Sequence, residues 1–162
     1  MKLAEYIQEI ISKTNSISEE RKSKIEPLLS YLIQKRNSNE AIHLNFVCTH
    51  NSRRSQFAQI WAQTAADYYG FECSTYSSGV EVTAFNNRAI KALENVGFKV
   101  QIGKGDNPKV QLDNGFRSMN CFSKLIDNQI NPKSNFAAIM TCSHADENCP
   151  IVNGMEKRMA LN

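Results

Sequence analysis

The sequence predicts an α/β fold built on a parallel sheet, preceded by a helical extension. From residue 42 onward, short apolar runs of strand length alternate with segments of helix length, which is typical of βαβ units. One of these runs, residues 136–141, is apolar almost throughout, as expected of a strand that is buried on both faces. Before residue 42, apolar residues recur at helical spacing. We therefore expect a helical extension over residues 1–41 and an α/β domain over residues 42–162.

Length and composition fit one globular domain. The chain has 162 residues, of which 41% are hydrophobic and 22% charged, and this is enough for one sizeable core. A net charge of +3 is too small to argue for nucleic acid. No apolar run reaches the roughly 20 residues of a membrane span, and the first residues do not resemble a signal peptide. We therefore expect a cytoplasmic protein with no nucleic-acid or membrane partner.

The helical extension consists of two expected helices. The first has apolar residues on one face between Leu3 and Ile11. A capping box with Ser16 as its N-cap and Glu19 three residues later is expected to start the second helix. Pro27 should kink this helix or mark a later start. We expect the two helices to pack against the domain. A partner-binding hairpin is the alternative.

Strands and helices are expected to alternate after the polar linker at residues 36–40. We expect a strand over 42–47, a helix over 55–69, a strand over 71–76 closed by Ser77-Ser78-Gly79, a helix over 84–96 and a strand over 136–141. Gly70 and Gly97 stand where the two helices should end. Residues 99–135 are the least regular part, where Val100, Ile102, Val110 and Leu112 hint at short strands and Asp113-Asn114-Gly115 offers a hairpin turn. We interpret this section as an irregular excursion near the site.

A tight loop is expected between the first strand and the following helix. It has the sequence Cys48-Thr49-His50-Asn51-Ser52-Arg53-Arg54-Ser55. Backbone N–H groups in such a loop point at one spot together with the positive end of the helix, so they can bind a tetrahedral oxyanion. The residues expected to surround a phosphate-like anion are Thr49, His50, Asn51, Ser52, Arg53 and Arg54.

The same loop carries the expected chemistry. The positive field should stabilise the thiolate of Cys48, which would be the nucleophile. Arg54 offers a planar pair of donors to two substrate oxygens. Ser55 can donate a hydrogen bond to the Cys48 sulfur and help it to leave later, while Asn51 tolerates the positive φ that the turn needs. The alternative for Cys48 is a buried, inert thiol. His50 could support the thiolate or only line the loop.

These residues resemble the low-molecular-weight protein tyrosine phosphatase superfamily, and within it the thioredoxin-coupled arsenate reductases. The likeness covers about residues 42–162 and depends on three blocks: the loop Cys48–Gln56, the segment Ser77–Glu81 with the helix after it, and the segment Met140–Pro150. The resemblance implies a flavodoxin-like doubly wound parallel sheet. The third block belongs to the reductase branch.

For that branch, the resemblance implies a relay of three catalytic cysteines. Cys142 would attack the Cys48 sulfur and release arsenite, Cys149 would resolve the resulting disulfide, and thioredoxin would reduce the Cys142–Cys149 disulfide. The two cysteines are spaced more widely than the usual zinc-binding pairs, so we expect neither a metal site with His144 nor a cofactor. The remaining cysteines, Cys73 and Cys121, are expected to be packing residues.

The sequence also departs from the family pattern. His50 replaces the glycine that is common in the loop, which could narrow the pocket or shift substrate preference. Arg53 is expected to face solvent. Gln59 stands where the reductases often have a glutamate linked to potassium binding, so we do not expect that ion here. The Asp-Pro general acid and the closing helix of the superfamily are absent, so we expect a truncated chain. Loss of a general acid typically costs roughly 10²–10⁴ in rate.

Three functions remain open from the sequence. The first is an arsenate reductase-like enzyme that uses Cys48, Cys142 and Cys149. The second is a phosphatase that acts on phosphotyrosine or a small phosphoester through Cys48 and Arg54. The third is a non-catalytic module that binds an oxyanion or a partner. The Cys142–Cys149 segment distinguishes the first from the second.

Overall fold

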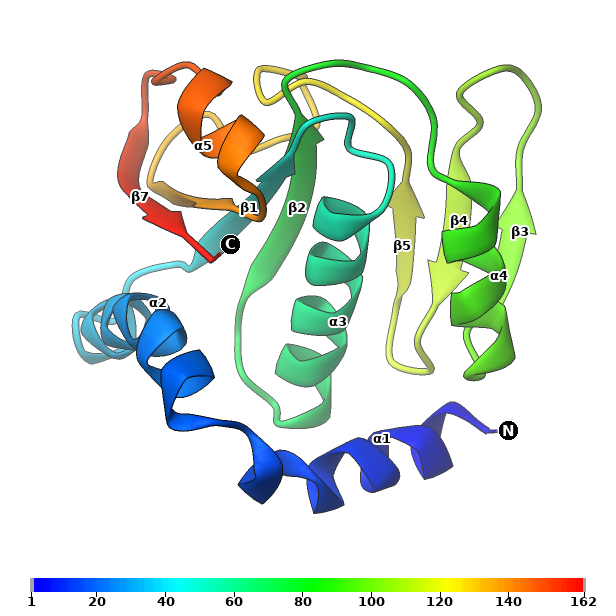
Figure 1. Cartoon of the computed structure of the whole chain (residues 1–162), viewed down its shortest axis with the longest axis horizontal. Helices are drawn as coiled ribbons and strands as arrows, with labels where there is room; N and C mark the ends of the chain where they lie inside the picture. Colours follow the sequence, from blue (N-terminus) through cyan, green and yellow to red (C-terminus); the bar gives the residue numbers. More distant parts are fainter. Residues whose placement is uncertain (1, 162) are drawn as a thin grey trace.

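The computed structural model describes residues 2–161 and consists of a central parallel sheet, a smaller antiparallel sheet and flanking helices (Figure 1). In chain order the elements are α1 (Leu3–Ser12), a 3-10 turn (Thr14–Ser16), α2 (Glu19–Asn37), β1 (His43–Cys48), α3 (Arg54–Tyr68), β2 (Ser74–Gly79), α4 (Asn87–Asn95), β3 (Lys99–Ile102), β4 (Val110–Asp113), β5 (Ser118–Cys121), β6 (Phe136–Met140), α5 (Ser143–Asn148) and β7 (Met155–Ala160). No helix among these residues is long and apolar enough to cross a membrane.

The central sheet has the strand order β2-β1-β6-β7, with all neighbouring strands parallel. Numbered within the sheet this order is 2-1-3-4, the start of the flavodoxin-like order, which confirms the predicted fold class. One face of the sheet packs against α2 and α3, and the other packs against residues 126, 145 and 149. The carboxyl ends of β1 and β6 are neighbours, so residues that follow these strands meet at one edge of the sheet.

Most predicted elements of the domain are confirmed, but the second strand was predicted three residues too early. β2 contains Ser77, Ser78 and Gly79, which were expected to close it. The two serines are buried, and the Ser78 hydroxyl donates to Asn45 on β1 at 2.8 Å. A partner on another strand therefore allows a polar residue inside the sheet, and the local pattern does not contain that information. The helix expected over 84–96 also begins later, at Asn87.

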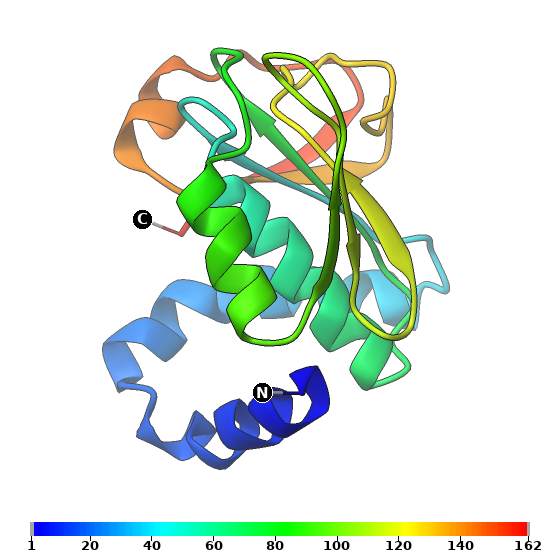
Figure 2. The same cartoon turned by 90° about the vertical axis from the view of Figure 1, so that its right-hand side faces the viewer.

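Part of the region expected to be irregular is an antiparallel sheet. β3, β4 and β5 form a three-stranded meander, and the predicted turn at Asp113-Asn114-Gly115 joins its last two strands. Figure 2 shows this sheet beside α3 and α4, and Figure 1 shows it on the opposite side of the molecule from β7. Its inward residues share a core cluster with Ile60 of α3 and Leu93 of α4. The hints of short strands at Val100, Ile102, Val110 and Leu112 are therefore confirmed. The expectation of an irregular excursion over 99–135 was wrong for the three strands of this sheet.

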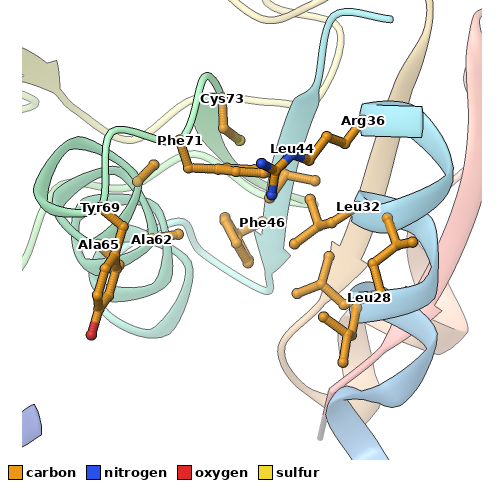
Figure 3. Close-up of a pocket in the computed structure, with 13 residues that line it drawn as sticks. Leu28, Leu32, Arg36, Leu44, Phe46, Ala62, Ala65, Tyr69, Phe71 and Cys73 are labelled. Atoms are coloured by element: carbon orange, nitrogen blue, oxygen red, sulfur yellow. The ribbon is translucent and has the colours of Figure 1, made fainter. Parts of the chain in front are cut away.

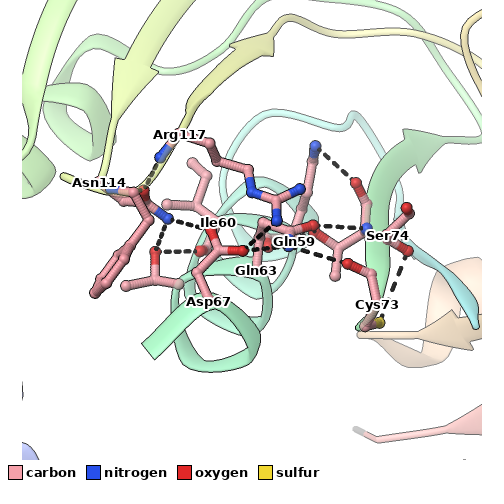
Figure 4. Close-up of polar contacts among 11 residues, drawn as sticks. Gln59, Ile60, Gln63, Asp67, Cys73, Ser74, Asn114 and Arg117 are labelled. Atoms are coloured by element: carbon pink, nitrogen blue, oxygen red, sulfur yellow. Dashed lines mark hydrogen bonds and ion pairs between the residues drawn. The ribbon is translucent and has the colours of Figure 1, made fainter. Parts of the chain in front are cut away.

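Buried polar contacts fix the far end of α3 to both sheets (Figure 4). Asp67 forms an ion pair with Arg117 at 2.5 Å and accepts a hydrogen bond from Asn114 at 2.8 Å, both from the turn between β4 and β5. Gln63, one turn earlier, donates to the Cys73 carbonyl at 3.0 Å just before β2. Because the Asp67 side chain is only 3% exposed, these contacts hold the helix in a fixed position behind the loop.

The N-terminal helices pack against the domain, as expected. α1 contacts the domain through Tyr6, whose ring lies 5.7 Å from that of Trp61, and through Leu3, which packs on Gly97. The start of α2 was predicted incorrectly, because its N-cap is Ser18 and not Ser16. Ser16 instead belongs to the short 3-10 turn. Pro27 lies inside α2, so it does not mark a later start. Whether residues 1–41 form a separable unit stays a prediction.

A buried lysine ties α2 to the edge of the central sheet. Lys35 lies 2.6 Å from both Glu40 and Glu156 of β7, and Tyr31 donates to the same Glu156 carboxylate at 2.6 Å. Beside this contact, α2 and α3 enclose an apolar groove with a volume of about 440 Å³ (Figure 3). Leu28 and Leu32 of α2 face Phe46 of β1 across it. The extension therefore covers part of this sheet face and leaves an open apolar groove between α2 and α3.

Candidate active site

The loop between β1 and α3 turns its carbonyl groups outward. Each carbonyl from Cys48 to Arg53 accepts a hydrogen bond from outside the centre of the loop. The Cys48 and Thr49 carbonyls accept from the amides of Val80 and Glu81, and the His50 carbonyl accepts from the hydroxyls of Ser123 and Thr83. The Asn51 carbonyl accepts from Gln56 Nε2, and the Ser52 and Arg53 carbonyls accept from the amides of Asn86 and Phe57. With the carbonyls held outward, the N–H groups of the same peptides are left to face the inside of the loop.

These inward amides lie at the start of α3. Among the described residues, no hydrogen bond uses the amide of His50, Ser52 or Arg53 as its donor. Asn51 has a φ of 46°, the left-handed conformation that closes the turn. The loop therefore combines unused donors with the positive end of a 15-residue helix, which is the arrangement that binds tetrahedral oxyanions.

The contacts of Asn51 leave the Ser55 hydroxyl free to donate to the Cys48 sulfur. Asn51 is fully buried, and its Oδ1 accepts from the Lys124 amide at 3.0 Å, so its Nδ2 must be the atom that donates to Ser55 Oγ at 2.8 Å. The Ser55 oxygen thus accepts from Asn51, and its own proton is free to point at Cys48 Sγ, 3.0 Å away. The site therefore has a hydroxyl within hydrogen-bond distance of the Cys48 sulfur.

A second layer of residues supports the loop from behind, and the sequence did not indicate it. Gly79 at the end of β2 lies so close that a Cβ there would stand 2.7 Å from Asn51 N and 2.8 Å from Thr49 O. The segment after β5 contributes Ser123, which donates to the His50 carbonyl, and Lys124, which bonds Asn51. These contacts join residues about 73 positions apart, so no local pattern could have indicated them.

Cys142 lies next to the loop, directly before α5. Its Sγ is 3.6 Å from Thr49 Oγ1. Burial raises the pKa of the Cys142 thiol. Hydrogen bonds from the Thr49 hydroxyl and from the amides of Ala145 and Thr49, together with the charge of Arg54, outweigh that effect and leave the pKa below its ordinary value. The structure therefore places a second thiol that ionises readily beside the loop of the first.

Cys149 follows α5 and is buried. Burial raises the pKa of its thiol, and the charge and hydrogen bond of Arg158 partly oppose this. Cys48, Cys142 and Cys149 belong to one hydrophobic cluster. Cys121 lies in the core beside α4 and Cys73 packs near α2, and burial raises the pKa of both thiols to about 12. The fold thus separates the three cysteines at the site from the two in other clusters.

Comparisons with known proteins agree with the motif. The chain is 35% identical over 107 residues to arsenate reductase 2 of Staphylococcus saprophyticus, and the match covers 66% of this chain and 65% of that protein. It is 38% identical over 106 residues to the arsenate reductase of Staphylococcus aureus strain Newman, with 65% and 63% covered. By sequence, this chain is similar to the arsenate reductases. The match thus spans a little under two thirds of the length of these relatives.

The solved structures give a weaker likeness to arsenate reductases and phosphatases. A thioredoxin-dependent arsenate reductase of Corynebacterium glutamicum aligns with a TM-score of 0.45 at 14% identity, covering 98% of this chain and 82% of that one. A low-molecular-weight phosphotyrosine phosphatase of Vibrio cholerae O395 aligns with a TM-score of 0.44 at 20% identity, covering 68% and 64%. No family model matches the chain.

The departures from the arsenate reductase pattern have clear positions in the structure. The His50 side chain is 51% exposed and pairs through Nε2 with Glu81 Oε2 at 3.1 Å, so it lies at the outer edge of the loop. Arg53 and Arg54 are both exposed. Gln59 is buried and donates to the Thr75 carbonyl at 3.2 Å. The glutamine therefore serves as a contact between α3 and β2.

Proposed function

We propose that this chain reduces arsenate to arsenite through a relay of Cys48, Cys142 and Cys149. The observation that carries the proposal is the contact between Thr49 Oγ1 and Cys142 Sγ at 3.6 Å. It brings the second thiol to the loop that holds the first, within one buried cluster. A phosphate-binding loop that only hydrolyses esters has no need of that second thiol. The sequence similarity to arsenate reductases supports the same reaction.

The first two steps follow from the positions of the groups. Loop amides and the Arg54 guanidinium hold the arsenate oxygens while the Cys48 thiolate bonds to arsenic and one oxygen leaves as water. The Cys142 thiolate then attacks the Cys48 sulfur. The electron pair of the S–As bond passes to arsenic, which falls from As(V) to As(III) and leaves as arsenite. Two thiols have become the Cys48–Cys142 disulfide, so the electrons balance.

The third step requires α5 to unwind. Cys142 and Cys149 are the N-cap and C-cap residues of this helix. A helical rise of 1.5 Å per residue places them about 10 Å apart, whereas a disulfide needs Cα atoms within about 7 Å. When α5 opens, the Cys149 thiolate can attack Cys142 and release Cys48. We propose that thioredoxin then reduces the Cys142–Cys149 disulfide, which places the protein in a reducing compartment such as the cytoplasm.

The test is a coupled assay with arsenate, thioredoxin, thioredoxin reductase and NADPH, in which turnover is measured as the consumption of NADPH. We expect turnover in the unmodified protein and none in the Cys142→Ser variant. The Cys73→Ser variant is the matched control, because that thiol lies in a different cluster, and it should keep turnover within about twofold. Absence of turnover in the unmodified protein, or turnover in the Cys142→Ser variant, contradicts the proposal.

A phosphatase is the second candidate, because the loop with Cys48, Arg54 and Ser55 is complete without Cys142. In that case the Cys142→Ser variant should hydrolyse an aryl phosphate as fast as the unmodified protein. A protein that binds inorganic phosphate tightly but processes neither substrate would instead be an oxyanion-binding module. Assays of the unmodified protein and of the Cys142→Ser variant with both substrates therefore distinguish all three functions.

A further inference from the structure

Arg158 of β7 holds the segment that carries Cys149. Its Nη1 donates to the Cys149 carbonyl at 3.0 Å. Its Nη2 donates to the carbonyl of Asp146 and lies 3.4 Å from the Asp146 carboxylate. The guanidinium thus bridges the last turn of α5 and the residue after it. No motif in the sequence singled this arginine out.

The same guanidinium faces the Cys149 sulfur. Burial is the largest influence on this thiol and raises its pKa, and the Asp146 carboxylate on α5 raises it further. Arg158 opposes both through its charge and through a hydrogen bond to the side chain. Among the described residues, Asp146 and Arg158 are the charged groups that act on Cys149. Within the described part of the chain, Arg158 is therefore the positive charge that lowers the pKa of this thiol.

We propose that Arg158 is a positioning residue for the resolving thiol. It holds the C-terminal end of α5 so that its guanidinium faces Cys149 and favours the thiolate that must attack Cys142. The inference rests on the proposed relay and adds a residue to it. The step itself is thiol–disulfide exchange: the Cys149–Cys142 bond forms, the Cys48–Cys142 bond breaks, and Cys48 leaves as a thiolate with no net change in oxidation state.

The size of the effect follows from the charge. An opposite charge in contact with an ionising group shifts its titration by about one unit or more. Removing Arg158 should reduce the Cys149 thiolate fraction about tenfold at neutral pH. A more basic thiolate is also more nucleophilic, with a Brønsted coefficient near 0.4–0.5, so the resolving step should slow by only about threefold to fourfold.

The first experiment needs no arsenate. The reduced protein is alkylated with iodoacetamide over a range of pH, and each cysteine is followed by mass spectrometry of its peptide. In the Arg158→Gln variant the pH midpoint of Cys149 alkylation should rise by about one unit. The midpoint of Cys142 alkylation should stay within about 0.3 unit of its value in the unmodified protein. Arg158→Lys should give an intermediate shift, because lysine keeps the charge but cannot bridge both carbonyls. Lys157→Gln removes the same charge from the preceding residue of β7, which is exposed, and should leave the midpoint of Cys149 alkylation unchanged.

The second experiment follows one turnover with arsenate and no thioredoxin. In the Arg158→Gln variant the Cys48–Cys142 disulfide should form at the normal rate and persist about threefold longer before Cys149 resolves it. An unchanged or lower midpoint for Cys149, an equal shift in Lys157→Gln, or faster resolution overturns the role of Arg158. If arsenate forms no Cys48–Cys142 disulfide at all, the proposed function fails, and the alkylation profile still decides whether Arg158 stabilises the thiolate.

Discussion

The oxyanion loop and the α5 segment lie at the ends of neighbouring strands, yet they differ in how many hydrogen bonds fix them. Every carbonyl from Cys48 to Arg53 has a donor, and Asn51 and Ser55 are buried with their polar atoms bonded. α5 has only six residues, its N-cap lacks a side-chain hydrogen bond, and one arginine bridges its last turn. The loop is thus fixed by many hydrogen bonds, and the short helix α5 by few.

This difference matches what each region would have to do in a relay. An anion site gains affinity when its donors are fixed before the ligand arrives. A disulfide between the two ends of a helix can form only if that helix opens, which favours a short element of low local stability. Substitutions that disturb the loop should therefore be more damaging than substitutions on α5 or at the outer rim.

The largest effect is expected from crowding the loop. Gly79→Ala would place a Cβ within 2.8 Å of three backbone atoms, and backbone cannot move aside as a flexible side chain can. We expect unfolding to become easier by about 3 kcal/mol and phosphate binding, measured by calorimetry, to fall at least tenfold. Gly105→Ala is the control, because no atom lies within 4 Å there and only its φ of 103° is unfavourable. Equal losses in both variants would show that the loop tolerates crowding.

A smaller effect, with the opposite sign, is expected from Lys124 behind the loop. Burial lowers the pKa of this lysine to about 8. Its ammonium lies over the Phe122 ring, and no carboxylate of residues 2–161 pairs with it. Between about pH 8 and 10.5 the folded protein binds fewer protons than the unfolded chain, so stability should rise with pH through that window. Lys124→Met should remove this rise.

The same variant should stabilise the protein at pH 7 by about 1–3 kcal/mol, because it removes an unpaired buried charge. Chemical denaturation at several pH values measures both effects. Lys109→Met is the control, since Lys109 is exposed and faces the same ring, and it should stay within about 0.5 kcal/mol. A loss of stability in Lys124→Met at pH 7 would mean that the buried charge supports the loop instead of straining it.

Thr49 connects the two regions and should show an intermediate effect on rate. Thr49→Val keeps the shape of the side chain and removes the hydroxyl that contacts Cys142. The Cys142 thiol should then ionise at higher pH, and the step that releases arsenite should slow by about fivefold at neutral pH. Thr49→Ser should restore most of the rate. Rapid-quench measurement of arsenite release checks this, and a Thr49→Val variant with normal release would leave Thr49 as a packing residue only.

The sequence was informative where a site lies on consecutive elements. Cys48 and Ser55 stand at the two ends of one loop between a strand and a helix, so a local pattern could predict that they lie together, and their side chains are 3.0 Å apart. The role of Arg54 stays a prediction. Ser123 and Lys124 reach the loop through contacts that span 73 positions, and residues 122–126 form no regular element whose periodicity could indicate them. Arg158 is closer in sequence to Cys149 but contacts it from a different element, β7. The register of β2 was missed for the same reason, since the buried Ser78 finds its partners on β1 and at Asn131.

The smallest effect is expected at the rim, where His50 and Glu81 pair at 3.1 Å with both side chains more than half exposed. Exposed ion pairs contribute at most about 1 kcal/mol and often nothing. Glu81→Gln should leave unfolding by denaturant unchanged within about 0.5 kcal/mol. It should strengthen phosphate binding by about twofold at low salt, because a negative charge near the anion is removed, and the gain should disappear at high salt. A loss of stability as large as that of Gly79→Ala would show instead that the rim, like the inner loop, is fixed by its side chains, and the contrast between a rigid loop and a loosely held surround would fail.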